Sequence, residues 1–139
     1  MKVIVDSNLL VSALVSGGGP AALVLDAWRR RRFQLVTSEE QLDEVRRVTR
    51  YPRVRSLISA TAAGVLVNRL REASIVLETW PTVDRSLDPA DNFLLGMAEA
   101  SKADYLATGD KRHLLTLERH LTTRIVTARQ LLEALGVEP

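Results

Sequence analysis

Short runs of β-branched and aliphatic residues alternate along the chain with stretches in which apolar residues recur at helical spacing. The runs predicted as strands lie at residues 3–5, 33–36, 74–77, 105–107 and 124–126. The helical stretches lie at 21–28, from 38 onward, at about 56–72 and after 88. Such alternation is typical of a parallel sheet covered by helices on both faces. We therefore predict an α/β fold with a central, mostly parallel sheet of five strands.

Two of the expected helices begin with recognisable capping residues. Ser38-Glu39-Glu40-Gln41 has the spacing of a capping box, in which the first and fourth residues satisfy each other's backbone N–H groups. Asp88 precedes Pro89, and a cap residue before proline is typical of a first helical turn. These signals predict helices that begin directly after the second strand and after residue 88.

Two acidic residues follow predicted strands. Asp6 comes directly after the first strand, and Asp110 follows the fourth strand through Thr108 and Gly109. Either aspartate alone is also explained as the cap of the next helix. In an open parallel sheet, however, ligands bind outside the carboxyl ends of the strands. Both residues are therefore candidates for a functional site.

Two further acids lie on predicted helices. Glu44 is about 40° from Val48 around its helix, at the border of the buried side, and the alternative is a surface pair with Arg47. Asp91 is in a first helical turn, about 40° from Leu95, and leans toward the sheet. The positive end of the helix dipole alone would favour an acid there, and it would also keep the carboxylate ionised.

Four carboxylates at one sheet edge would repel one another unless a cation shared them. Oxygen ligands favour Mg²⁺ or Mn²⁺, which bind carboxylates together with water and phosphate oxygens. The expected chemistry is metal-assisted attack of water on a phosphodiester bond. Whether the four acids converge is decided by the fold, because their spacing along the chain does not determine it.

Composition narrows the class of protein. The chain has 139 residues, 46% hydrophobic and 26% charged, which predicts one globular domain over residues 1–139. It has no cysteine, which excludes disulfides, thiolate metal sites and a thiol nucleophile. Asp6 comes too early for a signal peptide, and no apolar run approaches the roughly 18–20 residues of a membrane span. A soluble, cytoplasmic protein without a membrane partner is expected.

The net charge of +2 is a cancellation between two parts of the chain. Residues 28–72 hold 11 arginines against 5 acids, whereas the remainder holds 8 basic against 12 acidic residues. Arginine suits phosphate groups, although a GC-rich genome also enriches it. We predict that the basic segment contacts a nucleic-acid backbone. The candidate RNA-binding residues are Arg46, Arg47, Arg50, Arg53 and Arg55.

Four segments together resemble the PIN domain family of metal-dependent ribonucleases, and within it the VapC-like toxins of toxin–antitoxin pairs. They are residues 3–10, 38–45, 88–94 and 105–111. The resemblance implies a three-layer α/β/α fold. It places Asp6, Glu44, Asp91 and Asp110 at the acidic catalytic and metal-binding positions. It also implies that Ser7, Asn8 and Thr108 hold the carboxylates or a metal-bound water. Glu40 and Asp43 remain alternatives to Glu44.

These observations predict an Mg²⁺- or Mn²⁺-dependent endoribonuclease, the toxin of a toxin–antitoxin pair, that leaves a 5′-phosphate and a 3′-hydroxyl. An antitoxin that covers the acids is the implied partner, and the resemblance implies a homodimer. The alternatives are a PIN-like nuclease acting on structured DNA and a catalytically inactive nucleic-acid-binding or assembly domain.

Other site chemistries fit the sequence less well. His113 and His120 lack a partner at zinc spacing, and no Gly-x-Ser-x-Gly elbow is present. The glycine run 17–19 lacks the lysine of a phosphate-binding loop. A receiver domain needs a phospho-accepting aspartate after the third strand, where Glu78 follows instead. A haloacid-dehalogenase-type phosphatase needs a second aspartate where Asn8 stands.

Overall fold

A computed structural model describes residues 1–109 and 113–137. Its sheet has six strands in the order β3-β2-β1-β4-β6-β5. They are β1 (Lys2–Val5), β2 (Gln34–Ser38), β3 (Ile75–Leu77), β4 (Tyr105–Ala107), β5 (Arg119–His120) and β6 (Thr123–Val126). All neighbouring strands are parallel except β5 and β6. The predicted α/β fold with a mostly parallel sheet is confirmed.

The expected number of five strands is wrong because of β5. This strand has only two residues, Arg119 and His120, and pairs antiparallel with β6. Two residues are too few to show the alternation of apolar and polar positions that marks a strand. Leu121, in the turn between the two strands, has a φ of 51°. Positive φ values are uncommon for residues other than glycine, so a leucine gives no sequence signal for this turn.

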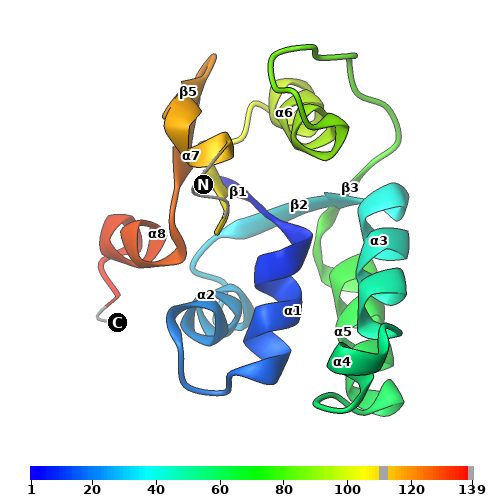
Figure 1. Cartoon of the computed structure of the whole chain (residues 1–139). Coiled ribbons are helices and arrows are strands. Elements are labelled where there is room, and N and C mark those ends of the chain that lie inside the picture. Colours follow the sequence, from blue (N-terminus) through cyan, green and yellow to red (C-terminus); the bar gives the residue numbers. More distant parts are fainter. Residues whose placement is uncertain (110–112, 138–139) are drawn as a thin grey trace.

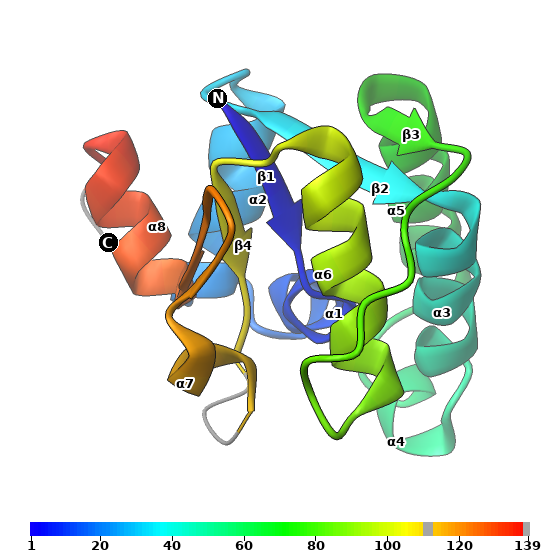
Figure 2. The same cartoon turned by 90° about the horizontal axis from the view of Figure 1, so that it is seen from above.

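Helices cover both faces of the sheet. Their bounds are α1 (Ser7–Val15), α2 (Pro20–Arg29), α3 (Glu39–Thr49), α4 (Pro52–Arg55), α5 (Ala60–Ala73), α6 (Pro89–Ser101), α7 (Leu114–Leu117) and α8 (Ala128–Leu135). Figure 1 shows α6 above the sheet and α1, α2 and α5 below it, and Figure 2 shows the same layers from above. The three-layer arrangement expected from the resemblance is confirmed.

The strands are buried on both faces, as parallel strands between helical layers must be. Val3 and Val5 belong to the core under α1, α2, α3, α5 and α8, whereas Ile4 belongs to the core under α6. All three side chains are at most 2% exposed. This double burial explains the short continuous apolar runs in the sequence.

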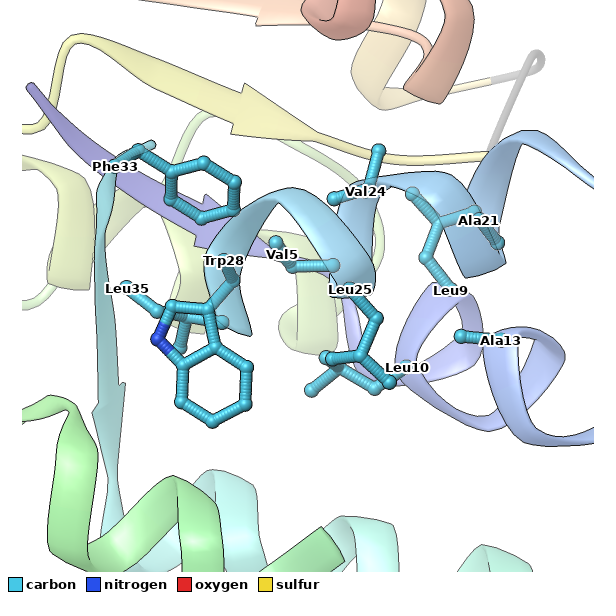
Figure 3. Close-up of a pocket in the computed structure, with 10 residues that line it drawn as sticks. All are labelled: Val5, Leu9, Leu10, Ala13, Ala21, Val24, Leu25, Trp28, Phe33 and Leu35. Carbon is cyan, nitrogen blue, oxygen red and sulfur yellow. The ribbon is translucent and has the colours of Figure 1, made fainter. Parts of the chain in front are cut away.

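Between α1, α2 and the strands β1 and β2, the apolar side chains pack closely against one another (Figure 3). Trp28 and Phe33 close one end of this cluster, and the gap that remains has no room for a water molecule.

No single helix in the described ranges is long and apolar enough to cross a membrane. Within the same residues, α1 and α2 together reach the required length and composition, as a pair bent by 99°.

The helix starts follow the capping residues, with two corrections. Ser38 accepts from the backbone N of Gln41, but the Gln41 side chain turns elsewhere, so the reciprocal half of the expected capping box is absent. The helix expected at about 56–72 begins at Ala60, with Ser59 as its cap, because a separate short helix, α4, precedes it. Asp88 caps α6 as predicted, accepting from the backbone N of Ala90.

Candidate functional site

The carboxyl ends of β1 and β4 lie side by side at the centre of the sheet. From β1 the chain order continues through β2 to one edge, and from β4 through β6 to the other. This reversal of strand order is where open α/β sheets bind their ligands. Asp6 follows β1 and Thr108 follows β4, so both stand at the reversal point. The backbone N of Asp6 donates to the Ala107 carbonyl at 2.9 Å and extends the pairing of the two strands.

The Asp6 carboxylate is held by hydrogen bonds to both of its oxygens. Thr108 Oγ1 donates to Asp6 Oδ2 at 2.8 Å, and the backbone N of Asn8 donates to Oδ1 at 3.2 Å. Thr108 is itself fully buried, and its backbone N donates to the Val126 carbonyl of β6. These two donors fix the orientation of the carboxylate at the end of β1.

Ser7 and Asn8 begin the helix that Asp6 caps. Ser7 is only 1% exposed, and its Oγ has no hydrogen-bond partner among the described residues. A buried hydroxyl without a partner costs free energy, which a bound water or ion at its oxygen would offset. The Asn8 side chain is exposed beside them.

Asp91 is buried in the first turn of α6, with 4% of its surface exposed. Ser86 Oγ donates to Asp91 Oδ2 at 2.8 Å. Burying a carboxylate is costly, and two features offset the cost here: the hydrogen bond from Ser86 and the positive end of the α6 dipole. The structure thus places Asp91 toward the sheet, as its position in the helix predicted.

The loop that carries Ser86 is held by Asn92. The Asn92 side chain accepts from the backbone N of Arg85 at 3.0 Å and of Ser86 at 2.8 Å, and donates to the Ser86 carbonyl at 2.8 Å. Arg85 Nη1 also donates to the Arg119 carbonyl and to His120 Nδ1. Ser86 and Asn92 were not among the predicted site residues, because nothing in the local pattern shows that a loop six residues back folds onto the helix.

A third residue missed from the sequence, Gln41, joins β1 and β2 to α3. Its Nε2 donates to the Val5 carbonyl at 2.7 Å, directly before Asp6, and its Oε1 accepts from Thr37 Oγ1 at 2.7 Å. Gln41 is fully buried. Its place in the Ser38 capping pattern suggested a local role, whereas its side chain positions the end of β1.

Of the three acids that were alternatives on α3, Glu44 is the least exposed. Its side chain is 30% exposed and lies 3.8 Å from Arg47 Nη2. Asp43 is 67% exposed and pairs with Arg46 at 2.7 Å. Glu40 is exposed one turn before Glu44. The half-buried position expected for Glu44 is therefore observed, together with the surface pair to Arg47.

Asp110 lies outside the described residues. In ranges 1–109 and 113–137, no three Asp, Glu or His side chains are close enough to form a metal cluster. Asp6 and Asp91 are each held by a hydroxyl donor, and α6 packs on β1. What the described structure provides is two separately oriented carboxylates, with Glu44 on the helix after β2.

The five candidate arginines do not form one surface. Arg46, Arg50 and Arg55 line a pocket of about 210 Å³ between α3 and α5. Arg46 is about 160° around α3 from Glu44, whereas Arg47 is beside it. Arg53 is exposed on α4. Arg47 is therefore the neighbour of Glu44, whereas Arg46 pairs with Asp43.

The start of α3 is tied to the end of α5 by an ion pair. Arg71 donates from Nε to Glu39 Oε1 at 2.7 Å and from Nη2 to Oε2 at 3.0 Å. These hydrogen bonds lower the pKa of Glu39 below its ordinary value and raise the pKa of Arg71. The pair is exposed, so it orients α3 more than it stabilises the fold.

A family model described as a PIN domain matches residues 2–112. The chain belongs to the PIN domain family. No curated protein matches the chain. PIN domains are generally nucleases and typically use divalent metal ions. The matched residues contain Asp6, Asp91 and Thr108, so the site described above lies inside the PIN domain.

The donors at this PIN-domain site fit a hard divalent cation. Asp6, Asp91 and Thr108 offer only oxygen atoms, and the unpartnered Ser7 hydroxyl is adjacent in the chain. Mg²⁺ and Mn²⁺ prefer such ligands, and a cation would offset the cost of the buried Asp91 carboxylate.

Proposed function

We propose that this PIN domain is an Mg²⁺- or Mn²⁺-dependent endoribonuclease. The observation that carries the proposal is the Asp6 carboxylate, oriented by Thr108 at the point where strand order reverses. The buried Asp91, oriented by Ser86, supports it from the neighbouring helix. Two carboxylates held in fixed orientations at the carboxyl ends of the strands are typical of a metal-dependent phosphodiester hydrolase. They fit this chemistry better than catalysis by a side-chain nucleophile.

The four acids divide between two roles in this proposal. Asp6, Asp91 and Asp110 would hold the principal cation, and Glu44 would complete the cage or orient the attacking water. When bound, the cation lowers the pKa of water and neutralises charge on the phosphate oxygens. Thr108 and Ser86 would each hold one of the two carboxylates in a fixed orientation, so that neither must reorient during the reaction. Ser7 and Asn8 would hold a water at the rim.

RNA is the proposed substrate because residues 28–72 carry an excess of arginine. Arg47, next to Glu44, is placed to meet a phosphate near the acids, and Arg46, Arg50, Arg53 and Arg55 would act further along the strand. The products would be a 5′-phosphate and a 3′-hydroxyl.

The biological role we propose is that of a cytoplasmic toxin, a homodimer held inactive by an antitoxin whose segment covers the acids. The resemblance of the four acidic segments to VapC-like toxins supports this role. Expression of the chain should arrest growth, Asp91→Asn should abolish the arrest, and the product of a neighbouring gene should relieve it. Equal arrest by Asp91→Asn would contradict a toxic effect through RNA cleavage.

The decisive experiment for the activity is cleavage by the purified, partner-free protein. Single-stranded RNA, structured RNA, single-stranded DNA and branched DNA are incubated with Mg²⁺, Mn²⁺ or chelator. We expect RNA cleavage with either metal and none with chelator or in Asp6→Asn. Asp26→Asn, a half-exposed carboxylate on α2, is the matched control and should cleave normally.

Three results would each count against a part of the proposal. Cleavage in chelator would contradict the metal mechanism, and cleavage of DNA alone would favour the nuclease of structured DNA. Binding of RNA without any cleavage would favour the inactive binding domain.

A further inference from the structure

A pocket of about 320 Å³ lies between α6 and the start of α3, and none of Asp6, Glu44 and Asp91 lines it. Its walls come from the linker between β3 and α6, from the first turns of α6 and from the start of α3. The linker passes along the side of α6 nearer to α3 (Figures 1 and 2). This volume is within the range of roughly 300–1,000 Å³ that is usual for small-molecule sites.

The pocket reaches the proposed site from the side of Glu44. Pro89 and Asn92 line it from the first turn of α6, on a different side of the helix from Asp91. Glu40 lines it from α3 and is one helical turn, about 5 Å, before Glu44 on the same face. A nucleotide with its phosphate at the acids therefore has a place for a neighbouring base within reach.

One wall of the pocket is aromatic. Trp80 and Phe93 meet edge to face, with ring centroids 5.2 Å apart and an angle of 72° between the ring planes. Both side chains are only half-buried, so part of the aromatic surface is open to the pocket. Every nucleobase has a flat π-face that stacks on such rings.

The aromatic wall is held in place before any ligand arrives. The linker lies so close to α6 that a Cβ at Gly96 would be 2.6 Å from the Pro81 carbonyl oxygen and 3.2 Å from Trp80 Cδ1. Asn92 fixes the other end of the linker through its bonds to Arg85 and Ser86. A preordered surface loses little entropy on binding, which favours recognition.

Resting on the proposed function, we propose that this pocket receives one unpaired base of the RNA substrate. The base stacks on Trp80, and the Glu40 carboxylate accepts hydrogen bonds from its Watson–Crick edge. Guanine fits best, because it presents two adjacent N–H donors to the two carboxylate oxygens, whereas the other bases present fewer. The pocket would thereby select single-stranded RNA and a guanosine next to the cleaved bond.

Tryptophan fluorescence tests the base directly. The chain has two tryptophans, so Trp28→Phe leaves Trp80 as the only emitter. In this background, with Asp6→Asn to prevent hydrolysis, the ligand is a short uridine oligonucleotide with one central guanosine. The comparison ligand carries an abasic sugar in place of the guanosine. We expect quenching and roughly tenfold tighter binding with the guanosine. Equal quenching and affinity for both ligands would overturn the proposal.

Two substitutions assign the contacts. Trp80→Ala should weaken binding of the guanosine ligand roughly tenfold, as measured by a label on the RNA, and Trp80→Phe should retain most of the affinity. Glu40→Gln should remove the preference for guanosine over adenosine, with Glu72→Gln, an exposed acid on α5, as its matched control. A preference that survives Glu40→Gln would contradict the role of this carboxylate.

The two proposals fail in different ways. If the chain cleaves no RNA yet Trp80 still reports the guanosine, the nuclease proposal is wrong and the base pocket stands. If the chain cleaves the guanosine and abasic ligands equally, and Trp80→Ala leaves KM unchanged, the base pocket is wrong and the nuclease stands.

Discussion

Asp6 and Asp91 both stand at the beginning of a helix, yet the chain holds the two carboxylates by different means. Asp6 is fixed by the sheet: its partner Thr108 is 102 residues away and reaches it only because β1 and β4 are neighbours. Asp91 is fixed locally, by Ser86 five residues earlier in a loop that Asn92 holds. One carboxylate therefore depends on the long-range topology and the other on the conformation of one linker.

The largest expected effect is the loss of RNA cleavage when the charge of either Asp6 or Asp91 is removed. Asp6→Asn and Asp91→Asn should each lower RNA cleavage more than roughly 100-fold, because changes to partners of metal ligands alone cost about 10–100-fold. Both variants keep the size of the side chain and should remain folded, which circular dichroism checks. Cleavage at the parent's rate by either folded variant would contradict its role as a metal ligand.

The next effect separates the two ways of holding a carboxylate. Thr108→Val and Ser86→Ala each remove one hydroxyl donor and should lower cleavage about 10–100-fold. Thr108→Val removes a long-range contact between the ends of two strands. Ser86→Ala removes a local contact between the linker and α6. Thr108→Ser should restore the rate of cleavage at position 108. Full activity in Thr108→Val would show that the hydrogen bond to Asp6 does not matter for catalysis.

A smaller effect concerns the linker alone. Gly96→Ala brings a Cβ to 2.6 Å from the Pro81 carbonyl oxygen, so the linker must shift, at a cost of about 1–3 kcal/mol. Gly64→Ala on α5 is the matched control, because its Cβ would have no neighbour within 4 Å. It should stabilise the helix by about 0.5–1 kcal/mol. Urea unfolding of both variants measures the difference, and equal stabilities would show that the linker is not close-packed on α6.

The smallest expected effect is the pH dependence of the Glu39–Arg71 pair. Its hydrogen bonds lower the pKa of Glu39 below the ordinary value of 4.5. The unfolded chain then binds the proton more readily than the folded one. The stabilisation is therefore present above the ordinary pKa and is lost as pH falls through the lower, folded value. Urea midpoints of Arg71→Gln and the parent should differ slightly at neutral pH and converge in acid. A constant difference would contradict this linkage.

The same contrast explains how much was predictable. Local spacing along the chain was enough to predict the parallel sheet and several single residues. They are the acids Asp6 and Asp91 and the helix caps Ser38 and Asp88. Ser86 and Asn92 were missed because their contacts depend on the path of the loop. Gln41 was missed because its partner, the Val5 carbonyl, lies on another strand. The pattern also does not single out α8 or the two-residue β5.

The sequence by itself determined the alternation of strands and helices, because double burial of parallel strands requires continuous apolar runs and amphipathic helices. It also determined which acids follow those elements. Only the tertiary structure decided that β1 and β4 are neighbours, that Thr108 meets Asp6, and that Arg46, Arg50 and Arg55 line one pocket. The physical reason is that strand order and loop path depend on packing between distant segments. Local sequence patterns carry no record of that packing.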